Sequence, residues 1–93
     1  MTAITDINTS GASSQVITAR GMMGVVLNGT WNSATVSLQK KIGGSWYTIK
    51  DYTANANDVI ESVGSATYRF STRGTPSIIC EVTFDGPGNG SVE

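Results

Sequence analysis

The sequence predicts an all-β fold, a single antiparallel β-sandwich of about seven strands, and three observations support this prediction. Apolar and polar residues alternate in several stretches, which is the pattern of strands with one buried face. Turn-forming residues, mainly Gly, Asn, Ser and Pro, separate these stretches at intervals of about 8–12 residues. No stretch shows the apolar repeat of an amphipathic helix. The sandwich is expected to be immunoglobulin-like or jelly-roll-like in architecture, without the two cysteines of an antibody domain.

The chain of 93 residues is long enough for one small domain, which we expect over residues 15–85. Residues 1–14 are polar apart from Ile4 and Ile7, and predict an N-terminal arm that is either disordered or ordered by a partner subunit. Residues 86–93 are rich in glycine and predict a flexible C-terminal tail.

The first strands are expected over residues 15–20 and 22–28, interrupted by Gly21. Gly24 lies inside the second stretch and suggests a bulge or a close approach of another backbone. Met22 and Met23 fit a buried strand, and exposure at a subunit interface is the alternative because methionine adapts well to partner surfaces.

The clearest alternation covers residues 34–40, which we expect to form a strand with Val36 and Leu38 on its buried face. Gly43-Gly44 predicts a tight hairpin turn, since paired glycines supply positive φ angles. The return strand is expected over 46–52. We place Tyr47 and Ile49 inward on this strand, with Trp46 at the core edge or against a neighbouring subunit.

Residues 53–58 have the composition of a loop, and a short strand is predicted over 59–63. Two further strands follow, over 66–73 and 77–84, and both alternate clearly. The side chains expected to face the core are Ala66, Tyr68, Phe70, Ile78, Cys80, Val82 and Phe84.

The residue types exclude most chemistry, so we expect no enzyme, no cofactor and no metal site. The chain has no histidine, which rules out a Ser–His–Asp or Cys–His set and removes the commonest zinc ligand. Cys80, the single cysteine, alternates with apolar residues and is expected to act as a small buried hydrophobe. A thin core without disulfide or metal favours stabilisation by oligomerisation.

The charge and hydropathy of the chain also argue against certain classes of partner and location. The net charge is −1 and only 14% of residues are charged, which argues against nucleic-acid binding. No apolar run approaches the roughly 20 residues of a membrane helix. The first residues lack the pattern of a secretory signal, so we expect synthesis in the cytoplasm.

The aromatic residues leave one alternative open. Trp31, Trp46, Tyr47 and Tyr52 could stack on sugar rings if they lay on the surface of a β-sandwich, or they could fill the core or a protomer interface.

The stretch from Gly29 to Phe70 resembles a pattern of small structural proteins of tailed bacteriophages: a G-T-W strand start with A-T-V-x-L-Q, a glycine-rich turn, a W-x-x-I strand and a later Y-R-F. The matching residues are Gly29, Thr30, Trp31, Ala34, Thr35, Val36, Leu38, Gln39, Gly44, Trp46, Ile49, Tyr68, Arg69 and Phe70.

The resemblance implies a virion protein, most specifically a capsid decoration (cement) protein on the capsid surface, synthesised in the host cytoplasm. Its implied partners are the major capsid protein and further copies of itself, as a dimer or trimer. A carbohydrate- or receptor-binding accessory domain of a tail or fibre is the alternative. From the residues themselves, the candidate interface comprises Ile4, Ile7, Met22, Met23, Trp31 and Trp46.

Overall fold

The computed structural model describes residues 2–7, 11–12, 16–84 and 88–92, and it contains strands but no helix within these ranges. In chain order the strands are β1 (Thr2–Ile7), β2 (Gly11–Ala12), β3 (Ile17–Arg20), β4 (Met23–Thr30), β5 (Thr35–Ile42), β6 (Ser45–Tyr52), β7 (Ala56–Ile60), β8 (Ser65–Arg73), β9 (Ser77–Phe84) and β10 (Gly90–Val92).

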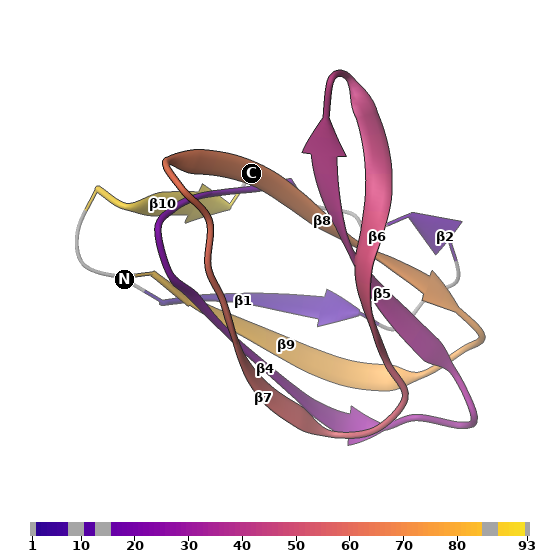
Figure 1. The fold of residues 1–93 in the computed structure, drawn as a ribbon. Helices are drawn as coiled ribbons and strands as arrows, with labels where there is room; N and C mark the ends of the chain where they lie inside the picture. The colour runs from indigo at the N-terminus through magenta and orange to yellow at the C-terminus, as the bar shows by residue number, and fades with distance from the viewer. Residues whose placement is uncertain (1, 8–10, 13–15, 85–87, 93) are drawn as a thin grey trace.

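The strands form two antiparallel sheets, which confirms the predicted β-sandwich (Figure 1). Sheet A has the order β1-β9-β4-β7. Sheet B has the order β10-β3-β8-β5-β6, and β2 pairs with one end of β8. Neighbours in each sheet are distant in sequence in most cases, so the fold depends on long-range pairing.

The core lies between the sheets and is formed by alternate residues of β3, β4, β5, β8 and β9. Phe70 and Tyr68 of β8 are its largest fully buried side chains. Each such side chain contributes about 1.5–3 kcal/mol by leaving water. All inward residues predicted for β8 and β9 are buried, including Cys80.

The N- and C-terminal segments differ from the predicted arm and tail, because both contain strands of the sandwich. Strand β1 pairs along its whole length with β9, and β10 pairs with β3. A short polar segment has no local pattern that predicts a strand, because its conformation is determined by the strand with which it pairs. The side chains of Ile4 and Ile7 lie outside the described part of the structure.

The predicted inward face of β6 is wrong. Tyr47 and Ile49 are exposed, and Tyr52 is the buried residue of this strand. The pairing of β5 with β6 shifts register after Leu38, so alternation is not continuous along β6. The tip of the β5–β6 hairpin also projects beyond sheet A, which leaves its inner face uncovered (Figure 1).

The turn prediction at the hairpin is confirmed. Gly43 and Gly44 have φ angles of 60° and 88°, the left-handed conformation that a two-residue hairpin turn requires. The next strand, β7, begins earlier than expected at Ala56, so part of the predicted loop pairs with β4.

Candidate functional site

The two sheets have outer faces of different chemistry. The outer face of sheet B is lined by polar and charged side chains from β3, β8, β5 and β6, and we call it the polar face. The outer face of sheet A carries exposed apolar side chains around Met22, Val59 and Ile79, and we call it the apolar face. Because the two faces lie on opposite sides of the sandwich, they can contact different partners at once.

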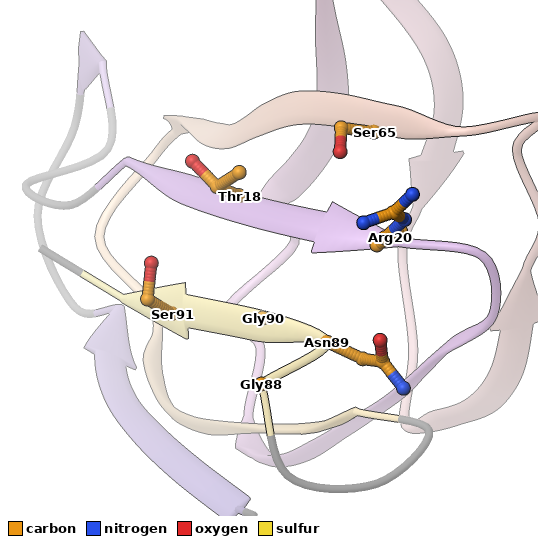
Figure 2. A pocket seen from close by; sticks show the side chains of 7 residues that line it. All are labelled: Thr18, Arg20, Ser65, Gly88, Asn89, Gly90 and Ser91. Atoms are coloured by element: carbon orange, nitrogen blue, oxygen red, sulfur yellow. The ribbon is translucent and has the colours of Figure 1, made fainter.

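The polar face is hollowed at one end, where β10, β3 and β8 lie side by side (Figure 2). The register places Ser91 opposite Thr18 and Ser65 opposite Arg20, so three hydroxyl groups and the guanidinium line the same hollow. The hollow has a volume of about 270 Å³ and is lined by Thr18, Arg20, Ser65, Gly88, Asn89, Gly90 and Ser91. The backbone N–H of Arg20 donates to the Asn89 carbonyl at 2.9 Å, which fixes the turn before β10.

Two glycines shape this end of the molecule. Gly88 has a φ of 82°, which a residue with a Cβ rarely adopts. Gly90 has ordinary backbone angles, but a Cβ at this position would lie 2.1 Å from the Phe84 ring. Glycine at position 90 therefore lets β10 lie close over the core.

Trp46 forms a second cluster on the polar face. The Arg69 guanidinium lies 4.5 Å from the centre of its ring and the Lys41 ammonium lies 5.9 Å from it. Arg69 Nε also donates to Gln39 Oε1 at 2.7 Å, and Gln39 Nε2 donates to Thr48 Oγ1 at 3.3 Å. These contacts link β8, β5 and β6 across the sheet and cover part of the indole.

The apolar face contains a shallow hollow of about 170 Å³ lined by Met22, Gly24, Val59, Thr83 and Phe84. Met22 is 46% exposed and Val59 is 58% exposed. Gly24 lies between them without a side chain, which leaves the floor of the hollow open. Such a surface can accept an apolar side chain from a partner protein.

A third exposed apolar group lies at the projecting hairpin. Ile42, Tyr47 and Ile49 are all exposed there, and Tyr47 is 53% exposed. Strand β6 is also the last strand of sheet B, so one side of its backbone has no strand partner among the described residues.

The two sheets are joined at one side by a polar cluster. Asp58 of β7 accepts a hydrogen bond from the Tyr52 hydroxyl at 2.9 Å and forms a salt bridge with Lys50. These two bonds lower the pKa of Asp58. Burial, followed by the bond to Asp58, raises the pKa of Tyr52. Both pKa shifts favour the protonation states that form these bonds, a neutral Tyr52 and an ionised Asp58. The cluster therefore helps to hold the two sheets together.

Nothing in the described part of the chain resembles a catalytic centre. Burial raises the pKa of the Cys80 thiol to about 12, which keeps it protonated and unreactive. Residues 16–84 and 88–92 contain no cluster of acidic or cysteine side chains that could hold a metal ion. None of the described residues belongs to a helix long and apolar enough to span a membrane.

The structure separates the predicted interface residues instead of gathering them. Met22 lies on the apolar face, whereas Met23 is buried in the core, because neighbouring residues of a strand point to opposite faces. The prediction of Met23 as an interface residue is therefore wrong. Trp46 is half-buried on the polar face. Trp31 packs against the core, and its Nε1 donates to Asn55 Oδ1 at 2.9 Å.

Sequence reasoning missed Arg20 and Val59 as site residues. A single arginine at a strand end gives no signal, because its neighbours in the hollow come from β8 and β10. Ile79 did give a signal, since it breaks the polar alternation of β9, and it is 57% exposed.

No protein-family model matches the chain, and no curated protein matches it. Among solved structures it is similar to a mitogen derived from Yersinia pseudotuberculosis, with a TM-score of 0.57 and 16% identity over 98% of this chain and 94% of that one. It is also similar to the nucleoplasmin-like N-terminal domain of Drosophila FKBP39, with 16% identity over 88% of this chain and 83% of that chain, but the TM-score is only 0.32. At this identity, the likeness to the mitogen shows a common fold alone.

Proposed function

We propose that this chain is a non-enzymatic structural protein of a bacteriophage virion, a capsid decoration protein that binds and stabilises the head as an oligomer. The observation that carries the proposal is the difference between the two outer faces. A decoration protein needs one surface that fits the shell and another that tolerates water, and it needs no catalytic group.

The apolar face is the surface that we assign to the major capsid protein. Met22, Val59 and Ile79 expose apolar area that costs free energy in water. Apolar residues and methionine are typical of the buried centre of protein interfaces. Docking this face against the shell leaves the polar face in solvent.

We assign the contact between copies of the chain to β6 and the hairpin tip. An eight-residue strand at a sheet edge presents backbone groups that can pair with the same strand of another copy. Tyr47 and Ile49 add exposed apolar area at the same place. An oligomer built in this way hides an edge that would otherwise invite aggregation.

The alternative of a sugar-stacking module on a tail or fibre has less support from the geometry. Trp31 is held against the core by its bond to Asn55, and Tyr52 is buried. The Trp46 ring is covered by Arg69. Three of the four side chains that could stack on sugar rings are thus occupied within the chain, and Tyr47 is the one that stays exposed.

Val59→Asp tests the docking surface, because it places a charge on the apolar face. We expect wild-type protein to co-sediment with heads of the encoding phage, and the variant to bind at least about tenfold more weakly, as burying an unpaired charge costs several kcal/mol. Thr67→Asp is the matched control, since it introduces the same charge on the polar face, where Thr67 pairs with Thr18 of β3. Equal binding by the two variants, or no binding by wild type, would reject the proposal.

A further inference from the structure

We infer that the polar face binds an acidic polysaccharide, and that the hollow around Arg20 holds one carboxylate-bearing sugar of that polymer. The inference goes beyond the proposed docking to capsids, because it concerns the opposite face of the sandwich. It rests on where the positive charges lie and on the chemistry of the hollow.

Positive charge is concentrated on the polar face although the whole chain has a net charge of −1. Four of the six Lys and Arg residues lie on this face. Asp51 is the one acidic residue among the described side chains there, and it accepts a hydrogen bond from Ser37. The four cations are Arg20, Lys41, Arg69 and Arg73.

These cations are spread along β8 and its neighbours and do not form one compact patch. Arg20 pairs with Ser65, and Arg69 and Arg73 follow on the same face at intervals of four residues. Four strand residues span about 13 Å, so the charges form an extended series. A chain with repeating negative charges matches this series better than a small compact anion does.

The hollow supplies groups that recognise a sugar. The hydroxyls of Thr18, Ser65 and Ser91 can both donate and accept hydrogen bonds, as sugar hydroxyls do. The Arg20 side chain is exposed and forms no salt bridge with any described residue, so its guanidinium is available to a carboxylate. No described acidic side chain lines the hollow.

The size of the hollow also limits the ligand. Its volume of about 270 Å³ lies below the usual range for drug-sized ligands, which starts at about 300 Å³. One sugar ring is a suitable occupant, and its neighbours in the polymer would run over the open surface of the sheet (Figure 2).

Single-stranded nucleic acid is the competing polyanion, and the geometry disfavours it. Such strands are bound largely by stacking of bases on exposed aromatic rings. Trp46 is the one aromatic side chain on the polar face among the described residues, and Arg69 covers its ring. The lining of hydroxyls and amides favours sugars over bases.

The test is calorimetric titration of the full chain with a short oligogalacturonate, whose sugars each carry a carboxylate. The methyl ester of the same oligosaccharide is the matched ligand, since it keeps the sugars and removes the charge. We expect binding of the acid, no measurable binding of the ester, and weaker binding as salt is raised. Oligothymidylate is titrated in parallel as the competing polyanion.

Arg20→Gln should weaken oligogalacturonate binding about tenfold or more, because it removes a charge-assisted hydrogen bond. Ser91→Asp is a second variant that should weaken binding by placing a negative charge in the hollow. Lys40→Gln is the matched control: Lys40 lies on the other side of the sheet and should leave the affinity unchanged. Unchanged affinity in Arg20→Gln, equal binding of the ester, or tighter binding of oligothymidylate would overturn the inference.

Discussion

At the scale of single residues, Asp58 makes two bonds that connect the two sheets. Its carboxylate receives the Tyr52 hydroxyl and the Lys50 ammonium, and it thereby joins β7 of sheet A to β6 of sheet B. A group whose pKa is lowered by folding stabilises the folded state above its ordinary pKa. That stabilisation is lost as the pH falls through the lowered pKa.

We therefore expect Asp58→Asn to reduce the free energy of unfolding by about 1 kcal/mol at neutral pH, and by less under acidic conditions. The ordinary pKa of aspartate, near 4, marks where the difference from wild type should begin to shrink. Urea unfolding of both proteins across an acidic pH series measures it. A difference that stays constant or grows as the pH falls would contradict this role.

The role of Asp58 could not be predicted from the sequence. Its segment has the composition of a loop, and only the pairing of Asp58 with Val25 shows that it belongs to a strand and faces inward. Cys80 is the opposite case: its apolar neighbours at alternate positions were sufficient to predict burial. Prediction works where the pattern is local and fails where a distant partner sets the orientation.

At the scale of elements, β8 and β9 were predictable because each has apolar residues at alternate positions and lies between two neighbouring strands. Strand β6 was not, because a register shift interrupts its alternation. Strand β10 is short and polar, and its place depends on a close approach to the core. Strand β10 can lie this close to the core because Gly90 has no side chain and leaves room for the Phe84 ring.

Gly90→Ala should lower the free energy of unfolding by about 1–3 kcal/mol, because the new methyl group overlaps the buried Phe84 ring. Gly24→Ala is the matched control, since a Cβ there lies 3.7 Å from its nearest neighbour, an ordinary contact. Chemical denaturation of the two variants compares them directly. Equal effects of the two substitutions would show that β10 does not pack as described.

At the scale of the molecule, the sandwich separates an apolar face from a polar face. The sequence predicted the sandwich, but it allowed either burial or interface exposure for Met22, and it did not predict that Met22 and Val59 lie together around Gly24. Two of these residues lie on β4 or next to it and the third on β7, so only the strand order brings them together. The central claim is that this face meets the capsid while the polar face remains in solvent.

The measurement that tests this claim most directly is a cryo-electron microscopy reconstruction of heads of the encoding phage incubated with the protein. We expect added density on the shell in which sheet A, with Met22 and Val59, faces the capsid protein and sheet B faces outward. Copies should meet along β6. A reconstruction without added density, or one in which sheet B lies against the shell, would contradict the account.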